Sequence, residues 1–221
     1  IQGGGRRARA LPVSGGGRYP LSLEAKNLSF RYRRGQPPVL QAVNLTVHPG
    51  ERVGLRGPSG RGKTTLCKLL AGYERPGNGQ VLLNGRPLSG FRGCCPVQLI
   101  GQHPETAVDP LLRLGDTLYE AGPVEEEVLE ALHIAPAWLD RYPTELSGGE
   151  LQRFCIARAL RPETRFLLCA EITAMLDLVT QAQIWEFLLD VASRRDLGLL
   201  IVSHQSLLLE KLCTRIEQLD V

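Results

Sequence analysis

The chain has 221 residues, a length that suits one large domain or two small ones with enough apolar material for a core. Its formal charge of +3 comes from four arginines that precede the first acidic residue, Glu24; without them, 22 of the 26 basic residues remain against 23 acidic ones. This balance excludes the basic footprint of a nucleic-acid-binding protein, and the longest apolar run, Leu197–Val202, is too short to span a bilayer.

The chain opens with a segment unlike the rest. Residues 1–20 contain two glycine triplets and four arginines but no apolar periodicity. Because such a composition buries too little apolar surface to fold, we predict a flexible tail here and a folded domain at residues 21–221.

Short alternating apolar segments separated by proline and glycine follow, and they predict strands joined by turns. Asn84-Gly85 is a strong hairpin signal, which predicts antiparallel pairing around it. The predicted strands are Leu21–Tyr32, Val43–His48, Arg52–Arg56 and Gln80–Leu83.

The pattern then changes twice. Between about residues 103 and 161, apolar residues recur at three- and four-residue spacing, which predicts helices. From Arg165 onward, predicted strands alternate with predicted helices, which is typical of a parallel sheet covered by helices. The predicted helices are Val124–His133, Gly149–Arg161, Leu178–Arg195 and Ser206–Cys213, and the late strands are Phe166–Cys169, Leu199–Ser203 and Arg215–Leu219.

The six cysteines contain no C-x-x-C pair, and most of them lie within apolar patterns. This usage predicts reduced, buried thiols in a cytosolic protein. The adjacent pair Cys94-Cys95 leaves a metal or redox site as the alternative.

Residues 57–65 read Gly-Pro-Ser-Gly-Arg-Gly-Lys-Thr-Thr and match the P-loop pattern G-x-x-x-x-G-K-[ST]. They lie between a predicted strand and a predicted helix, where glycines let backbone N–H groups point at a phosphate chain. Lys63 would place its charge on the outer phosphates, and the Thr64 hydroxyl can bind Mg²⁺. A chance glycine-rich turn is the alternative, and the strand-loop-helix context argues against it. The predicted phosphate-binding residues are Gly57, Pro58, Ser59, Gly60, Arg61, Gly62, Lys63, Thr64 and Thr65.

A second glycine motif, Leu146–Glu150, precedes an apolar-periodic helix. Ser147 and Glu150 have the spacing of a capping box, in which each side chain binds the other's backbone N–H. Capping alone does not explain Gly148 and Gly149, since each glycine weakens a helix by roughly 1 kcal/mol. Bare glycines let an anion approach the helix dipole, so we predict a ligand contact here rather than only a capped helix.

The order P-loop, then Leu-Ser-Gly-Gly-Glu about 85 residues later, resembles the ABC-type ATPases, whose signature is usually Leu-Ser-Gly-Gly-Gln. The resemblance covers the chain from Leu21 to about Val221. It implies an α/β P-loop NTPase (RecA-like) fold: a parallel-sheet core, an antiparallel β subdomain and an inserted α-helical subdomain at about residues 103–161. It also implies ATP and Mg²⁺ as ligands, and the Leu146–Glu150 motif argues against a P-loop kinase.

The resemblance implies further site residues. Tyr32 lies where the family stacks an aromatic ring on adenine, although a surface tyrosine on a strand is the alternative. Gln102 matches the Q-loop glutamine that touches Mg²⁺ or the attacking water. His204 matches the switch histidine at the γ-phosphate, and Asp177 the D-loop that reaches the partner's site.

Residues 166–171 resemble the Walker B strand, which normally ends in Asp-Glu. Glu171 matches the carboxylate that activates the attacking water. Ala170 stands where the family has the aspartate that holds Mg²⁺ through its water shell, so the metal would rely on Thr64, Gln102 and the phosphates. This departure predicts slow hydrolysis at the site built on this chain's P-loop. Either the chain is a weakly hydrolysing or non-hydrolysing regulatory partner in a heterodimeric ATPase, or the residue was altered to trap nucleotide.

In the family, two such chains pair head to tail, and each ATP lies between one P-loop and the other chain's Ser-Gly-Gly. The segment after Gln102 resembles ATPases of dipeptide, oligopeptide and nickel importers, and residues 171–184 look closest to the nickel and metal-chelate branch of that group. The resemblance implies a second ABC ATPase chain, membrane permeases and, indirectly, an extracellular solute-binding protein, at the cytoplasmic face of the membrane. A soluble ABC ATPase of translation or DNA repair is the rival, although such proteins usually fuse two ATPase halves or insert long coiled coils.

Overall fold

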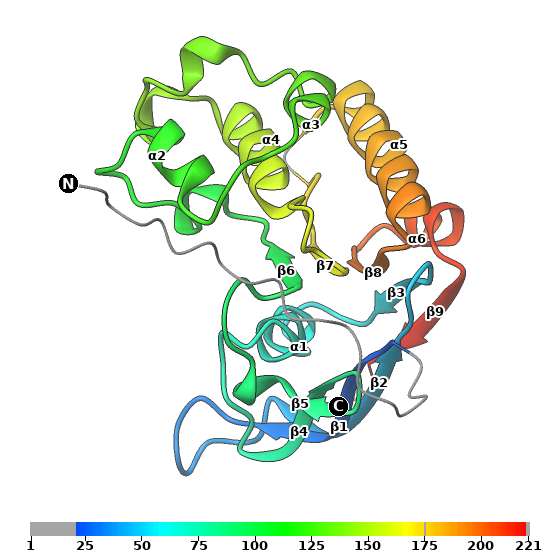
Figure 1. Ribbon diagram of the computed structural model, residues 1–221. Helices are drawn as coiled ribbons and strands as arrows, with labels where there is room; N and C mark the ends of the chain where they lie inside the picture. The colour runs from blue at the N-terminus through cyan, green and yellow to red at the C-terminus, as the bar shows by residue number, and fades with distance from the viewer. Residues whose placement is uncertain (1–20, 175, 220–221) are drawn as a thin grey trace, which may run out of the picture.

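A parallel sheet of five strands forms the centre of the computed structural model, which describes residues 21–174 and 176–219 (Figure 1). The predicted tail therefore lies outside the described residues. The strand order is β6-β7-β8-β3-β9. The strands are β3 (Arg52–Arg56), β6 (Val97–Ile100), β7 (Phe166–Ala170), β8 (Gly198–Val202) and β9 (Arg215–Gln218). β7 and β8 are buried along their whole length, as expected where helices cover both faces of a parallel sheet.

A second, antiparallel sheet has the strand order β2-β1-β4-β5. Its strands are β1 (Leu23–Phe30), β2 (Leu40–Val47), β4 (Asn78–Leu83) and β5 (Arg86–Pro87). Asn84 and Gly85 have φ angles of 54° and 74° and join β4 to β5, as the hairpin signal predicts. The alternating burial at both ends of β1 and in the second half of β2 places one face of this sheet against the core.

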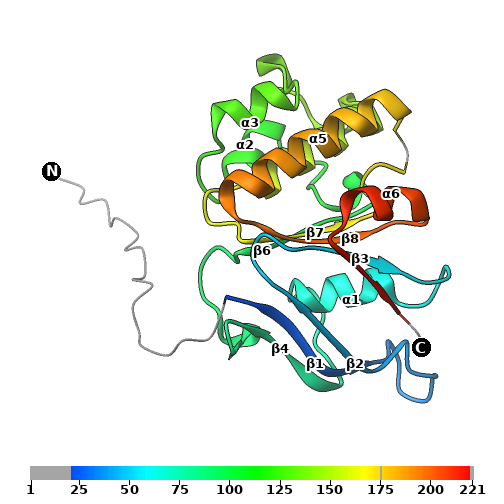
Figure 2. The same ribbon diagram turned by 90° about the vertical axis from the view of Figure 1, so that its right-hand side faces the viewer.

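Helices fill the space on both sides of the parallel sheet. α1 (Lys63–Leu70) lies between the two sheets, whereas α5 (Leu178–Arg195) lies on the opposite face of the parallel sheet (Figure 2). The other helices are α2 (Leu114–Tyr119), α3 (Glu126–Ala131), α4 (Gly148–Ala159) and α6 (Ser206–Leu212), with single 3₁₀ turns at Leu88–Gly90, Pro104–Thr106, Pro136–Trp138 and Pro143–Glu145.

The core has two parts, one on each side of the parallel sheet. Alternate residues of β7 belong to different parts because successive side chains of a strand point to opposite faces. Leu167 and Cys169 pack with the side that holds α4 and α5, whereas Phe166, Leu168 and Ala170 pack with α1 and the antiparallel sheet.

This architecture confirms the predicted fold class of a parallel core with an antiparallel β part and helices. The spacing of apolar residues in the 178–195 helix predicts one apolar side made of Leu178, Ala182, Trp185, Leu188, Leu189 and Ala192. This prediction is wrong at the start of the helix, because Leu178 is 80% exposed and Ala182 is exposed as well. The buried residues of α5 are Gln181, Ile184, Trp185, Leu188, Val191 and Ala192. The helix expected at residues 124–133 is shorter, spanning Glu126–Ala131, and α2 was not predicted as a separate helix.

Candidate nucleotide site

The P-loop connects β3 to α1 and depends on glycines with positive φ. Gly60 has a φ of 77° and Gly62 a φ of 82°. A Cβ on Gly62 would lie 2.9 Å from Leu40 Cδ2 and 3.0 Å from the Val39 carbonyl oxygen, whereas a Cβ on Gly60 would meet nothing within 4 Å. Gly62 is therefore required by both its conformation and its neighbours, and Gly60 by its conformation alone.

The lysine of the motif already lies inside the loop. Lys63 is 5% exposed, and its Nζ donates to the carbonyl oxygens of Gly57 at 2.7 Å and Pro58 at 2.8 Å. These bonds compensate the burial of the ammonium group. A phosphate that accepts from Nζ would replace one or both of them, which places the charge of Lys63 at the centre of the loop.

Tyr32 lies two residues after β1 and is held against the P-loop. Its hydroxyl and the Thr65 hydroxyl are 3.0 Å apart, and its ring meets Phe30 edge-on with centroids 4.9 Å apart. The residue as a whole is nevertheless 53% exposed. A fixed and exposed aromatic face beside a phosphate-binding loop suits the stacking of a base.

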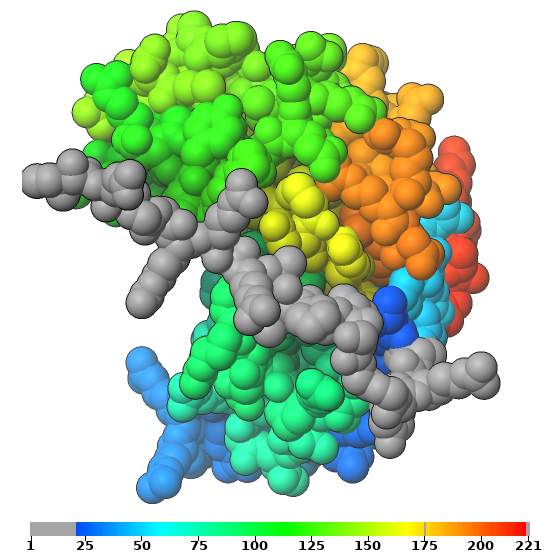
Figure 3. Space-filling view, in the orientation of Figure 1, coloured from blue at the N-terminus to red at the C-terminus, as the bar shows by residue number. Residues whose placement is uncertain are grey.

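Thr64 faces a cavity of about 760 Å³ that Gln102 and Ala170 also line. The sequence predicts that Gln102 ends a strand, whereas β6 ends at Ile100 and Gln102 follows two residues later. The cavity lies between α1 and the helical residues that follow β6. On the face drawn in Figure 3, the surface is indented between the green part above and the teal and blue part below. Thr64 and Gln102 offer neutral oxygens, which fit a Mg²⁺ ion that takes most of its ligands from phosphates and water, and Ala170 offers none.

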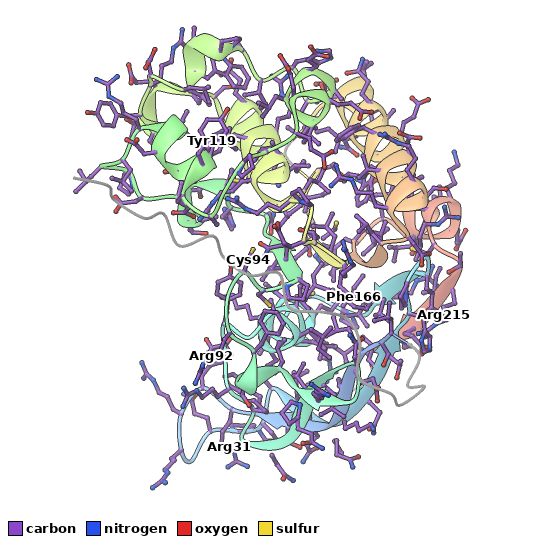
Figure 4. All side chains as sticks on the ribbon, viewed as in Figure 1. Arg31, Arg92, Cys94, Tyr119, Phe166 and Arg215 are labelled. Atoms are coloured by element: carbon purple, nitrogen blue, oxygen red, sulfur yellow. The ribbon has the colours of Figure 1, made fainter. Side chains whose placement is uncertain are left out.

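Cys94 lies on the same cavity, beside β6 in Figure 4, whereas Cys95 packs against the core. The two neighbouring thiols therefore face different surroundings and do not form a pair for a metal. Burial raises the pKa of the Cys95 thiol, and that of Cys67 to about 12. The described residues contain no group of three potential metal-binding His, Cys, Asp or Glu side chains.

Glu171 and His204 meet where β7 and β8 end. The parallel register pairs Ala170 with Val202, so the residues that follow these strands lie side by side. His204 Nε2 lies 2.7 Å from Glu171 Oε1, and the Glu171 N–H donates to the Val202 carbonyl at 3.0 Å. Glu171 has a φ of 57°, an uncommon conformation for a residue with a side chain. Carboxylate and imidazole at the carboxyl end of a parallel sheet form an acid–base pair.

The second glycine motif begins α4 as a capping box. Ser147 Oγ accepts from the Glu150 N–H at 3.3 Å, and the Glu150 carboxylate accepts from the Ser147 N–H at 2.8 Å. The backbone bond from Ser147 holds the pKa of Glu150 below its usual value. A Cβ on Gly148 would meet nothing within 4 Å, so the start of the helix stays open to a ligand.

Asp177 is the N-cap of α5. Its side chain accepts from the N–H groups of Val179 and Thr180, both at 3.0 Å, and from the Thr180 hydroxyl at 2.6 Å. The bond from the Thr180 hydroxyl is the largest cause that lowers the pKa of Asp177. In this structure, Asp177 therefore serves the helix end.

Ser147, Gly149, Glu150 and Asp177 line a cavity of about 250 Å³, separate from the one that Thr64 lines. The residues of the signature motif and Asp177 thus lie at one cavity, whereas Thr64 and Gln102 lie at another. Sequence analysis missed two basic residues of this cavity, His133 and Arg153. Arg153 could have been found from the sequence, because it follows Glu150 by three residues and therefore lies on the same side of the predicted helix. Its guanidinium stacks 5.3 Å from the Trp138 ring centroid and donates to the Leu132 carbonyl at 3.3 Å.

None of the helices in residues 21–174 and 176–219 combines the length and apolar character that crossing a membrane requires.

Comparison with known proteins gives consistent matches. The ABC transporter family model matches residues 40–174. The chain is 37% identical to the nickel import ATP-binding protein NikE of Rhodospirillum rubrum, over 90% of this chain and 80% of that protein. It is 33% identical to the NikE protein of Escherichia coli K12, over 90% and 83%. Among solved structures, a dimeric bacterial ABC transporter cassette superposes with a TM-score of 0.76 at 23% identity, over 89% of this chain and 93% of that chain.

Proposed function

The chain belongs to the ABC transporter family of ATP hydrolases, and on that premise we propose that it powers an importer for nickel, metal chelates or peptides. The observation that carries the proposal is the 37% identity to a nickel import ATP-binding protein over 90% of this chain. In this proposal, ATP binding and hydrolysis drive paired membrane permeases, to which an extracellular solute-binding protein delivers the substrate. The chain would then act as a peripheral subunit at the cytoplasmic face of the membrane.

The separation of the two glycine motifs supports a head-to-tail pair of chains. Thr64 and Ser147 line different cavities, so one bound nucleotide would need a second ABC chain to meet both motifs. The P-loop of one chain would hold the triphosphate. The open N-terminus of α4 from the other chain would cap the γ-phosphate, with Asp177 nearby. Closure on ATP and opening after hydrolysis would then drive the permeases.

The roles of the residues follow from their positions. Tyr32 would stack on the adenine, and Lys63 with the N–H groups of the P-loop would bind the phosphates. Glu171 would activate the attacking water, and His204, which contacts Glu171 in this structure, would contact the γ-phosphate when ATP is bound. Thr64 and Gln102 would hold Mg²⁺, whose charge offsets that of the phosphate oxygens.

Ala170 motivates a second candidate function. Its side chain is 2% exposed on the cavity where the family has an aspartate, and it has no oxygen to offer a metal. We therefore propose slow hydrolysis at this chain's own P-loop. The alternative is a regulatory partner that binds ATP without hydrolysing it and leaves turnover to the other chain of a heterodimer.

The test compares binding with turnover. A fluorescent ATP analogue should bind the full chain, and Lys63→Ala should weaken that binding by at least tenfold, whereas the exposed control Lys26→Ala should leave it unchanged. Steady-state ATP hydrolysis should then rise when the chain is purified with its permeases. Nucleotide binding without turnover when this chain is the only ATPase present, with turnover appearing once a second ATPase chain is added, would favour the regulatory partner. A chain that binds no nucleotide would refute both functions.

A further inference from the structure

Three side chains of α4 contact the segment that carries Gln102. Gln152 Nε2 donates to the Gly101 carbonyl at 3.2 Å, the Cys155 thiol lies 3.8 Å from the Pro104 carbonyl, and Arg158 Nη1 donates to the Ala107 carbonyl at 2.6 Å. The three donors are spaced three residues apart along the helix, and so are their acceptors. One side of α4 therefore holds residues 101–107 by successive backbone carbonyls. Figure 1 shows α4 close to the end of β6, from which this segment emerges.

Gln152 is an unusual member of this set. It is 3% exposed, and its Oε1 is buried without a partner among the described residues. A half-satisfied buried amide contributes little to stability, because the cost of the unpaired acceptor offsets the gain of the single bond. An apolar side chain of the same length would fill the space without that cost. What the bond to Gly101 does provide is a fixed contact with the backbone immediately before Gln102.

Gly101 and Gln152, which this hydrogen bond joins, lie next to two different nucleotide-binding regions of the proposed pair of chains. Gly101 precedes Gln102, which lines the cavity with Thr64 of the same chain. Gln152 lies in the second turn of α4, whose first turn begins at Ser147 and would face the nucleotide of the other chain.

We propose that Gln152 is a positioning residue that sets the place of Gln102. Through this contact, the rate of hydrolysis at the P-loop of one chain depends on the position of α4 in the same chain. That position changes when the start of α4 binds the nucleotide held by the other chain. This inference rests on the proposed function and adds a link between the two sites of the pair. Gln152 acts through the backbone of Gly101 and does not itself touch nucleotide.

The test uses Gln152→Met, which keeps the length and removes the donor. Gln181→Met is the matched control, because Gln181 is also buried and donates one bond, from Nε2 to the Leu176 carbonyl at 2.9 Å, away from residues 101–107. In the ATP-hydrolysing assembly, Gln152→Met should lower kcat about three- to tenfold with KM for ATP changed less than twofold. In a Gln102→Ala background, the same substitution should lower kcat less than twofold, because it acts through Gln102.

A second measurement needs no turnover. Amide hydrogen exchange over residues 101–107 of the full chain should become faster in Gln152→Met and stay unchanged in Gln181→Met. Unchanged exchange in Gln152→Met would overturn the inference, as would an equal loss of kcat with and without Gln102. If the parent chain does not hydrolyse ATP in any assembly, the proposed hydrolytic function is refuted. The exchange measurement then still tests whether Gln152 holds residues 101–107.

Discussion

Ala170→Asp tests the link between the altered strand end and slow hydrolysis. Ala170 is 2% exposed and packs with apolar neighbours, so a carboxylate there would lose most of its water in the nucleotide-free protein. Thr64 and Gln102 line the same cavity and carry no positive charge to compensate that of the new carboxylate. The free energy of unfolding should fall by about 2–4 kcal/mol. At about 2–4 °C per kcal/mol for a chain of this size, the melting temperature should fall by on the order of 10 °C.

Mg²⁺ and ATP should reverse this loss in the same variant. A carboxylate that holds the metal through its water typically changes metal affinity or activity by about 10–100-fold, so turnover should rise by at least about tenfold over the parent. The assays are a thermal melt with and without Mg-ATP and a steady-state ATPase titration in Mg²⁺. Ala170→Asn, of the same shape without the charge, should gain much less. If folded Ala170→Asp shows the parent's turnover and Mg²⁺ dependence, the reasoning about this position is refuted.

Three further outcomes follow from the structure. Gly62→Ala should destabilise the fold by about 2 kcal/mol or more and abolish nucleotide binding, whereas Gly60→Ala, without close neighbours, should cost only about 1 kcal/mol; chemical denaturation and ATP-analogue titration measure both. Burial raises the pKa of Glu51, but hydrogen bonds from the Arg215 guanidinium and the His48 N–H outweigh it, so the pKa is lowered. The ionised carboxylate therefore stabilises the fold at neutral pH, and this stabilisation is lost as pH falls below about 4.5. Glu51→Gln should therefore lose about 1 kcal/mol at pH 7 and converge with the parent in acid, and equal differences at both pH values would contradict this. In alkylation at pH 8, Cys94 should react first, and Cys67, whose pKa is raised to about 12, only after unfolding, as peptide mass mapping would show.

Local motifs were the most predictable part of the chain. The capping box of Ser147 and Glu150 forms as predicted because cap bonds join residues three apart and need no tertiary contact. The β4–β5 hairpin follows from Asn84-Gly85 for the same reason. The parallel sheet followed from the alternation of strands and helices, which sequence periodicity records directly.

Non-local features were less accessible. The exposure of Leu178 contradicts its apolar character because the sheet, and not the helix pattern alone, decides which side of α5 is buried. α2 has only six residues, too few for a clear period. The contact between Gln152 and Gly101 joins positions 51 residues apart, and no local pattern announces it. The expected roles of the site residues came from a family resemblance, and they remain predictions for the experiments above.

The placement of β7 between both halves of the core has an evolutionary consequence. Its side chains belong alternately to one half and to the other, and its backbone leads directly into Glu171. A change of side-chain volume in either half of the core would therefore displace β7, and with it the Glu171 carboxylate that follows the strand. Leu167 and Leu168 line neither of the two cavities described above, so substitutions there would offer natural selection a way to move Glu171 without altering a residue of either cavity.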